Sequence, residues 1–368
     1  MSGLTQYDPH AFLEQAISIP SDEDVTEMRE FLCETLKSQG IVPHVDEAGN
    51  TLATKGPAGG TPHLVLNTHI DTVTPHVPFE RRRGAETEHR FHGRGACDAK
   101  GPLASLLAAF IAVEPTDARV TLAVTPDEET LSTGAATLSL DGDMYIVGEP
   151  TGLDVCTAAK GRYQGTVSIR GRAAHAAEPE SGINSIATLE NVLRAIRTFD
   201  EDDSPHQHLG LPSLTPTIVE GGSATNQIPA ETTLVVDRRS IPPETADTFR
   251  NGLEQEIKTA VSRPVDISFT LTDRPSPFLQ PFATDTTDPL VVSIQEVTER
   301  LGVQSEIRPF EAATEASYFA PKPVIVFGPG VLKDENGGVA HGPREYVPVS
   351  AVKQAADILT ITVIELIE

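Results

Sequence analysis

The chain has 368 residues, which is long enough for two domains or for one domain with a large insertion. Its 53 acidic and 28 basic side chains give a formal net charge of −25, which argues against nucleic acid or an anionic membrane as a partner. No segment has the length and apolarity of a membrane span, and the N-terminal segment lacks the pattern of a secretory signal. Three scattered cysteines favour a reducing compartment without a disulfide framework, so we expect a cytoplasmic protein.

The basic side chains are twenty arginines and only eight lysines. A surface with many short acidic side chains and few long lysine side chains suits concentrated salt, where the ions screen the repulsion between like charges. We therefore expect a salt-loving source, the alternative being an ordinary acidic cytoplasmic enzyme.

The first part of the chain alternates between helices and strands. Helical periodicity predicts helices over residues 7–17 and 22–39, and another over 102–113. Short apolar segments predict strands over 63–67, 119–125 and 144–147. This alternation predicts an α/β domain with a mostly parallel sheet.

From about Gly161 the pattern changes to that of a smaller α+β unit. It predicts an alternating strand over 161–177, an amphipathic helix over 182–199, a strand over 232–239, a helix over 243–262 and a strand over 264–272. Beyond residue 275 the first pattern returns, with a helix over 289–301, a strand over 323–327 and a helix over 349–367. The sequence thus predicts a catalytic domain of residues 1–162 and 276–368, interrupted by a lid domain of residues 163–275.

Acidic residues and a histidine follow three of the predicted strands. His69 and Asp71 follow the first of them, Glu128 and Glu129 the second, and Glu149 the third. In open α/β sheets, ligands bind outside the carboxyl ends of the strands, so we expect these side chains to meet at one edge.

Two further candidates lie in loops. Asp98 is in the glycine-punctuated loop "GRGACDAKGP", and His341 is in the C-terminal loop "VAHGPREYV". Each such residue alone has an ordinary explanation, such as a solvated or helix-capping side chain. Together with the residues at the strand ends they favour a metal site.

Seven ordered motifs carry a resemblance to a known family. They are "NTHIDTV", "GRGACDAKGPLA", "TPDEE", "VGEPT", "RGRAAHAAEPESGINSI", "NQIPAE" and "AHGPREYV". From near residue 10 to near residue 365, the chain resembles the di-zinc peptidase and deacylase family M20, which includes acetylornithine deacetylase, succinyl-diaminopimelate desuccinylase, aminoacylase and glutamate carboxypeptidase. The resemblance implies a zinc-peptidase-like catalytic domain interrupted by an α+β lid that also forms a homodimer.

The resemblance implies two zinc ions per chain. His69, Asp98 and Glu149 would bind one ion, and Asp98, Glu129 and His341 the other, with Asp98 shared. Imidazole and carboxylate ligands without thiolate suit zinc, with cobalt or manganese as substitutes. A hydroxide bridging the ions would be the nucleophile.

The resemblance also implies catalytic roles for three residues outside this ligand set. Glu128 would be the general base, and Asp71 would orient the imidazole of His69. His175 would reach the active site of the partner in a dimer and donate a hydrogen bond to the oxyanion. In relatives, the peptide bond after the shared aspartate is cis, so the resemblance implies a cis bond after Asp98.

Substrate-binding candidates come from the same resemblance. Arg239 would bind the α-carboxylate of the substrate, with Arg238 as the alternative, because only one of two successive strand residues can face the site. Glu315, in "AATEASYF", resembles the acetylornithine deacetylase subgroup and would meet a cationic side chain such as that of ornithine. The remaining candidates are Asn226, Lys160, Gly328 and Gly330.

The function that we predict is metal-dependent hydrolysis of the amide bond of an N-acyl amino acid, as in amino-acid biosynthesis. One alternative is a metallo-carboxypeptidase or dipeptidase of the same family, and another is a catalytically silent metal-binding relative that acts as a binding protein. The expected partners are a small N-acyl amino acid or dipeptide and a second copy of the chain, with no nucleic acid and no membrane. Cys97 as a nucleophile, and His206 with His208 as metal ligands, are disfavoured because no other motif supports them.

Overall fold

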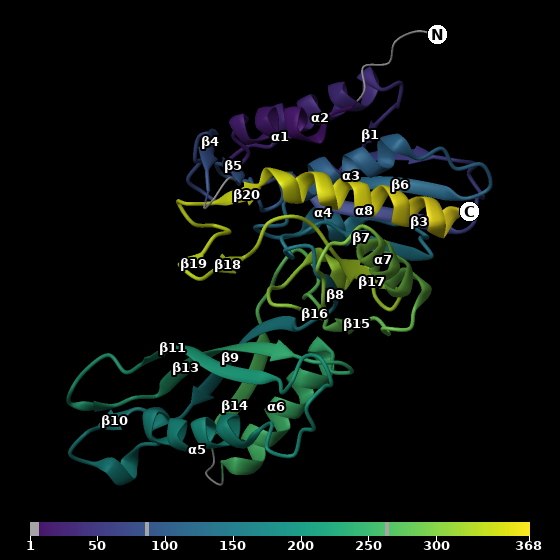
Figure 1. Ribbon diagram of the computed structural model, residues 1–368. Coiled ribbons are helices and arrows are strands. Elements are labelled where there is room, and N and C mark those ends of the chain that lie inside the picture. The colour runs from purple at the N-terminus through teal and green to yellow at the C-terminus, as the bar shows by residue number, and fades with distance from the viewer. Residues whose placement is uncertain (1–6, 85–87, 262–264) are drawn as a thin grey trace, which may run out of the picture. The chain divides into compact units, whose positions relative to one another are not determined.

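The structure is a computed structural model that describes residues 7–84, 88–261 and 265–368 (Figure 1). These residues form two compact units. Unit 1 comprises the chain up to Ala158 together with Ala283–Phe310 and Thr314–Glu368, and unit 2 comprises Ala159–Phe282 together with Glu311–Ala313. The catalytic and lid roles of these units remain predictions.

Unit 1 is built on a nine-stranded sheet. Its four central strands are parallel and lie in the order β6 (Arg119–Thr125), β3 (His63–His69), β7 (Met144–Val147) and β17 (Val324–Val326). Their side chains are buried almost throughout, as in parallel sheets covered on both faces. The predicted α/β class is thereby confirmed. The outer strands are β1 (His44–Val45), β2 (Thr51–Lys55), β8 (Val155–Ala159), β15 (Phe282–Ala283) and β16 (Ile307–Phe310).

Helix α3 (Lys100–Ala112) lies at the centre of unit 1 and is apolar on nearly all sides. It contacts β3 and β6 as well as α1 (Pro9–Ser18) and α8 (Val349–Ile367), so it is enclosed between the sheet and two other helices (Figure 1). A helix that is apolar all round must be buried in this way. The other helices of unit 1 are α2 (Thr26–Ser38), α4 (Thr133–Thr137), α7 (Pro289–Arg300) and the 3-10 turn η2 (Glu315–Tyr318).

Two smaller sheets complete unit 1. Strands β4 (Glu80–Arg83), β5 (His89–His92) and β20 (Tyr346–Pro348) form a three-stranded sheet with β5 in the middle. Strand β20 joins the loop of His341 to the start of α8, so this sheet anchors the C-terminal loop next to residues that precede α3. The second is the hairpin of β18 (Lys333–Asp334) and β19 (Gly337–Gly338).

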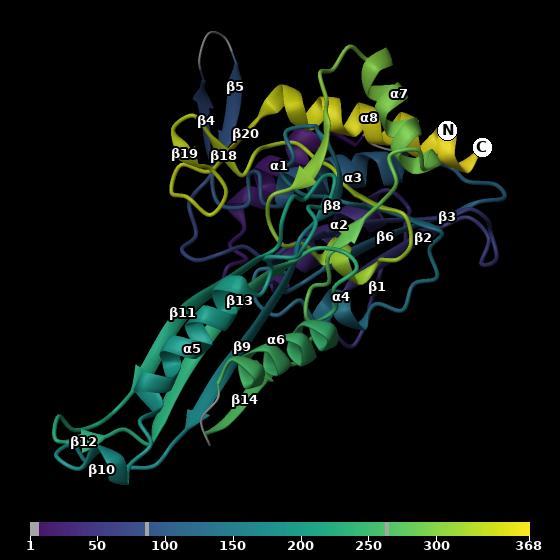
Figure 2. The same ribbon diagram turned by 90° about the horizontal axis from the view of Figure 1, so that it is seen from below.

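Unit 2 has an antiparallel sheet in the order β11 (Ser213–Gly221), β13 (Glu231–Ser240), β9 (Gly161–Arg170) and β14 (Asp266–Leu271). Buried and more exposed residues alternate along β9 and β13, which is typical of a sheet with one covered face. Helices α5 (Ser185–Thr198) and α6 (Ala246–Ala260) contact each other and the sheet, and both lie on that face (Figure 2). Unit 2 also contains β10 (Ala174–His175), paired with β12 (Gln227–Ile228), and the turn η1 (Pro179–Ser181).

Several strongly buried elements have the predicted bounds, whereas β8, which is buried along its whole length, was not predicted. The predicted bounds 119–125, 144–147 and 349–367 coincide with β6, β7 and α8. The strand predicted over 161–177 ends at Arg170, and β11 was not predicted at all. The predicted end of a helix at Ser262 and the predicted start of a strand at Pro264 lie outside the described residues. In the described ranges, the helices are too short or too polar to cross a membrane.

Candidate metal centre

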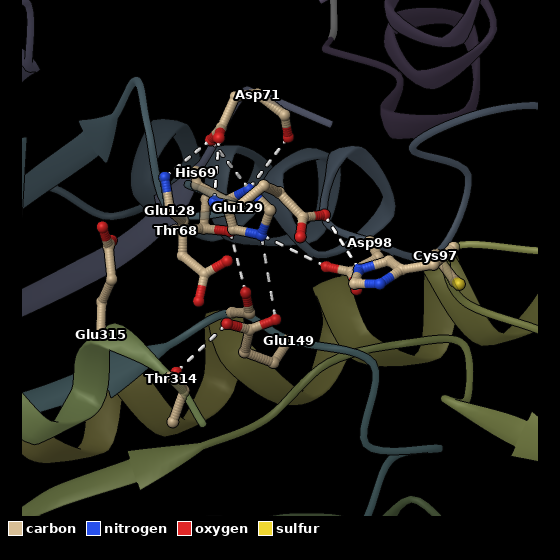
Figure 3. Close-up of polar contacts among 12 residues, drawn as sticks. Thr68, His69, Asp71, Cys97, Asp98, Glu128, Glu129, Glu149, Thr314 and Glu315 are labelled. Carbon is tan, nitrogen blue, oxygen red and sulfur yellow. Dashed lines mark hydrogen bonds and ion pairs between the residues drawn. The ribbon is translucent and has the colours of Figure 1, made fainter. Parts of the chain in front are cut away.

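The parallel strands bring the predicted site residues of three segments to one edge of the sheet. His69 is the last residue of β3 and lies opposite Thr125, the last residue of β6. Strand β7 pairs with the other side of β3 and ends two residues before Glu149. Because neighbouring parallel strands end at the same edge, the segments of His69, Glu129 and Glu149 leave the sheet side by side, as Figure 3 shows.

Asp98 lies between two histidines. Its Oδ1 is 3.2 Å from Nε2 of His69, and its Oδ2 is 3.2 Å from Nε2 of His341. Nε2 of His341 also lies 3.1 Å from Oε1 of Glu129, and Oε2 of Glu149 lies 4.0 Å from Nε2 of His69. The Asp98–Ala99 peptide bond is cis, as the resemblance implies.

The carboxylates of this edge are crowded and shielded from water. Burial raises the pKa of Glu149 well above its usual range, and the nearby charges of Asp98 and Glu129 add to the effect. Burial, together with neighbouring carboxylates, also raises the pKa of Glu128 well above its usual range. For Asp98, burial is outweighed by the hydrogen bonds to the two imidazoles, which lower its pKa. Ionising all of these carboxylates together is therefore unfavourable unless bound cations balance their charge.

The residues at this edge fit a pair of divalent ions. His69, Asp98 and Glu149 bring ligand atoms within 4.8 Å of one another, and so do Asp98, Glu129 and His341. Oε1 of Glu129 is buried and accepts no hydrogen bond of normal geometry in the described part of the chain, although Nε2 of His341 lies 3.1 Å away, so a cation could bind between these two atoms. Imidazole nitrogens and carboxylate oxygens are ligands that zinc, cobalt and manganese accept.

Asp71 makes more contacts than the sequence suggested. Nδ1 of His69 lies 3.0 Å from the backbone oxygen of Asp71 and 3.3 Å from its carboxylate. The same carboxylate accepts hydrogen bonds from the backbone N–H groups of Glu128, at 3.0 Å, and Glu129, at 2.9 Å. Asp71 therefore holds the loop that carries the proposed base and one proposed ligand, as well as contacting the imidazole (Figure 3).

Glu315 lies close to this group but is buried. Its side chain is 1% exposed, and Oε2 accepts a hydrogen bond of 2.7 Å from Oγ1 of Thr125. Burial raises the pKa of Glu315 to about 8, with the hydrogen bond from Thr125 acting in the opposite direction. Oε1 of Glu315 has no hydrogen-bond partner within the described ranges.

The two glycines among the predicted substrate residues pack against the site-bearing segments. A Cβ on Gly328 would lie 2.6 Å from the backbone oxygen of Glu149, and one on Gly330, whose φ is +84°, would lie 2.5 Å from Cβ of Cys97. Close packing therefore explains both glycines without a substrate contact.

Four predicted residues belong to unit 2, namely Lys160, His175, Asn226 and Arg239. His175 and Asn226 lie on adjacent segments, since the N–H of Ala176 donates to the backbone oxygen of Asn226. Nζ of Lys160 donates to the backbone oxygen of Leu211.

Arg238 and Arg239 differ in burial. Arg238 is 1% exposed and forms ion pairs with Asp200 and Glu244. Arg239 lies on the other face of β13, its side chain 41% exposed and paired with Asp237. Of the two guanidinium groups, only that of Arg239 is accessible to a ligand.

Sequence reasoning missed three residues that hold this site together. Oγ1 of Thr314 donates to Oε1 of Glu149 at 3.1 Å. Arg94 and Glu345 form a buried ion pair beside Asp98. All three residues lie within motifs quoted above, but no local pattern indicates which distant side chains Arg94, Glu345 and Thr314 contact.

Comparison with known proteins supports the family resemblance. The family model described as Peptidase family M20/M25/M40 matches residues 65–365. A protein of Pyrobaculum aerophilum named as a LysW-lysine/LysW-ornithine hydrolase is 28% identical over 351 residues, covering 92% of each chain. The acetylornithine deacetylase of Salmonella arizonae is 30% identical over 339 residues, covering 87% of this chain and 84% of its own length.

Solved structures share the fold. The aminopeptidase PepT from Bacillus cereus has a TM-score of 0.80 at 16% identity, and all of both chains is covered. A dinuclear metal-binding peptidase of the M20 family from Bacillus subtilis has a TM-score of 0.72 at 14% identity, with 97% of each chain covered.

We expect Asp71→Ala to loosen the loop of Glu128 and Glu129. Hydrogen bonds to a charged acceptor contribute about 1.5–3 kcal/mol each, so exchange of these two amide hydrogens should become at least about tenfold faster. Hydrogen exchange of the metal-free protein measures this effect. Asp117→Ala, at an exposed position, is the control, and unchanged exchange in Asp71→Ala would show that the loop is held by other contacts.

Proposed function

Because this chain belongs to peptidase family M20/M25/M40, we propose that it is a metal-dependent hydrolase that cleaves the amide bond of an N-acyl amino acid. The proposed type is that of acetylornithine deacetylase and succinyl-diaminopimelate desuccinylase. The observation that carries the proposal is the position of Asp98, which offers one carboxylate oxygen to each of two histidine-containing ligand groups.

The side chains divide into two sets that share one member. His69 and Glu149 would hold one divalent ion, Glu129 and His341 would hold the other, and Asp98 would contact both. Bound zinc, or cobalt or manganese in its place, would lower the pKa of a water molecule and polarise the amide carbonyl group.

Glu128 is proposed as the general base. Its backbone N–H is held by Asp71, and its carboxylate makes no hydrogen bond to another residue in the described ranges. The carboxylate is thus free to accept a proton from the attacking water and to return it to the departing amine, which leaves Glu128 in its starting state. The alternative of a catalytically silent binding protein has less support, because both the base and the complete ligand sets are present.

For the substrate, we propose an amino acid with a cationic side chain. The names of the Pyrobaculum aerophilum and Salmonella arizonae relatives both contain ornithine, whose side chain ends in an ammonium group. Glu315 is the proposed acceptor, since its Oε1 is a buried carboxylate oxygen without a hydrogen-bond partner among the described residues. Arg239 is proposed to bind the α-carboxylate, and Lys160 and Asn226 remain weaker substrate candidates.

We also propose a homodimer in which His175 completes the active site of the partner. Strand β11 is at the edge of the sheet of unit 2 and is exposed along almost its whole length. Ile218 and Val219 on this strand are each 57% exposed, and Ile186 of α5 is 46% exposed. A long exposed edge strand with apolar side chains is a surface on which a second copy can pair.

The proposed setting is a cytoplasm rich in salt. The charge of −25 and the excess of arginine over lysine support this setting, and Cys33, Cys97 and Cys156 form no disulfide bond with one another. Activity assays should therefore be run in concentrated salt.

The function is tested by amine release from the zinc- or cobalt-loaded protein. The substrates are N-acetylornithine, N-succinyl-diaminopimelate, LysW-ornithine and several dipeptides. We expect turnover of an N-acyl amino acid, and we expect Glu128→Gln to lower kcat by about 10²–10⁴-fold at unchanged metal content, because proton transfer by a positioned base contributes that much. Turnover of dipeptides alone would favour the peptidase alternative, and two bound ions without any turnover would contradict the proposal.

The role of Glu315 is tested by substrate selectivity. Glu315→Gln keeps an acceptor for Thr125 but removes the negative charge that Glu315 carries above its pKa of about 8, so kcat/KM for N-acetylornithine measured at about pH 9 should fall about tenfold or more, as expected for a lost hydrogen bond to a charged group. The matched uncharged substrate is N-acetylnorvaline, for which kcat/KM should stay the same. An equal loss for both substrates would assign Glu315 to the support of the site instead.

The shared active site is tested by mixing two inactive variants. His175→Ala keeps Glu128, and Glu128→Gln keeps His175, so a mixed dimer has one intact site. Equal amounts, dissociated and reassociated, should recover about a quarter of the wild-type activity, because about half of the dimers are mixed. No recovery would contradict the exchange of His175. Ile218→Arg should yield monomers by light scattering, whereas Val42→Arg, at an exposed position in unit 1, should not.

A further inference from the structure

Arg94 and Glu345 meet because of the register between β5 and β20. Tyr346 lies opposite His92, and the N–H of Gly93 donates to the backbone oxygen of Glu345. The pairing therefore places Arg94, which follows β5, beside Glu345, which precedes β20. Their side chains are 2% and 1% exposed, and Nη1 of Arg94 lies 2.7 Å from Oε2 of Glu345.

The guanidinium group of Arg94 holds the backbone of the His341 loop. Nη2 donates to the backbone oxygen of His341 at 3.3 Å, and Nη1 donates to that of Gly342 at 3.3 Å. Nε donates to the backbone oxygen of Pro75 at 3.1 Å. His341 has a φ of +61°, a conformation that residues other than glycine adopt at a cost. The hydrogen bonds from Arg94 help to stabilise this conformation at His341, whose side chain is a proposed metal ligand.

The carboxylate of Glu345 holds the backbone of the Asp98 loop. Oε1 accepts hydrogen bonds from the N–H of Cys97 at 3.1 Å and from the N–H of Asp98 at 3.2 Å. The thiol of Cys97 lies 3.6 Å from the same oxygen. One carboxylate oxygen thus fixes the backbone from which the Asp98 side chain extends, while the other oxygen contacts Arg94.

We propose that Arg94 and Glu345 are positioning residues for the metal centre, because together they hold Asp98 and His341 at the separation that one shared ion requires. The ion pair connects two segments that are far apart in the chain, and Oδ2 of Asp98 is 3.2 Å from Nε2 of His341. Buried ion pairs often contribute no more to stability than apolar side chains of the same size, so stability alone gives little reason for this pair. The inference rests on the metal centre of the proposed function.

The test is titration of the metal-free protein with metal ions. Binding is measured by calorimetry for Zn²⁺ and by visible absorption for Co²⁺. Glu345→Gln preserves the shape of the side chain but weakens its contact with Arg94. Arg94→Lys preserves the charge but loses the set of guanidinium N–H groups that donates to Glu345 and to the backbone of the His341 loop at the same time. Both variants should lower the affinity for at least one of the two ions by about 10–100-fold, as is typical when residues that orient ligands are changed.

Glu244→Gln is the matched control, since Glu244 forms the ion pair with the buried Arg238 in unit 2, and none of the candidate metal-ligand groups found among the described residues lies in that unit. It should lower the temperature of unfolding without changing metal affinity.

If Glu345→Gln and Arg94→Lys bind both ions as the wild type does and only unfold at a lower temperature, the pair is structural and the inference is wrong. If the wild type itself binds fewer than two ions, the proposed metal centre fails, and this inference fails with it. Should Glu345→Gln not fold, Arg94→Lys decides between the same outcomes.

Discussion

Asp98 directs one carboxylate oxygen at His69 and the other at His341, and the side chain is 9% exposed. Around this contact, Glu129 and Glu149 add carboxylates in a region that water hardly reaches. Burial raises the pKa of Glu149, because each added negative charge in a poorly solvated region costs free energy. Such an arrangement is stable when cations balance the charge, and this requirement links the fold of unit 1 to metal binding.

Carboxylates that accept backbone N–H groups keep this arrangement in place. Asp71 accepts two such hydrogen bonds from the loop after β6, and Glu345 accepts two from the loop before α3. These contacts act on the main chain, so the side chains of Glu128, Glu129 and Asp98 remain available for ligands or protons. Of the five candidate metal ligands, only His69 lies on a strand of the central sheet. The other four lie in loops, and these hydrogen bonds fix the backbone positions that a metal site requires.

Unit 2 uses charge differently. The guanidinium carbon of Arg238 lies 5.3 Å from the ring centroids of both Phe199 and Phe249. The side chain is paired with Asp200 and Glu244, so its charge is balanced within the unit. Neighbouring Arg239 is on the opposite face of β13, where it remains accessible. The alternation of a strand therefore assigns one arginine to the core of unit 2 and leaves the other for the proposed binding of a carboxylate.

The sequence by itself determined several of the strongly buried elements and the residues grouped in the candidate centre, but not the buried strand β8. Strands β6 and β7 and helix α8 have the predicted bounds, because continuous or periodic apolar runs reflect burial directly. Strand β11 escaped prediction since it is exposed and contains Pro216, which an edge strand tolerates. Only the tertiary structure decided that Arg238 is buried, that Glu315 is enclosed and that Arg94 meets Glu345. These outcomes depend on strand register and on contacts between distant segments, and a local pattern of residues carries no information about either.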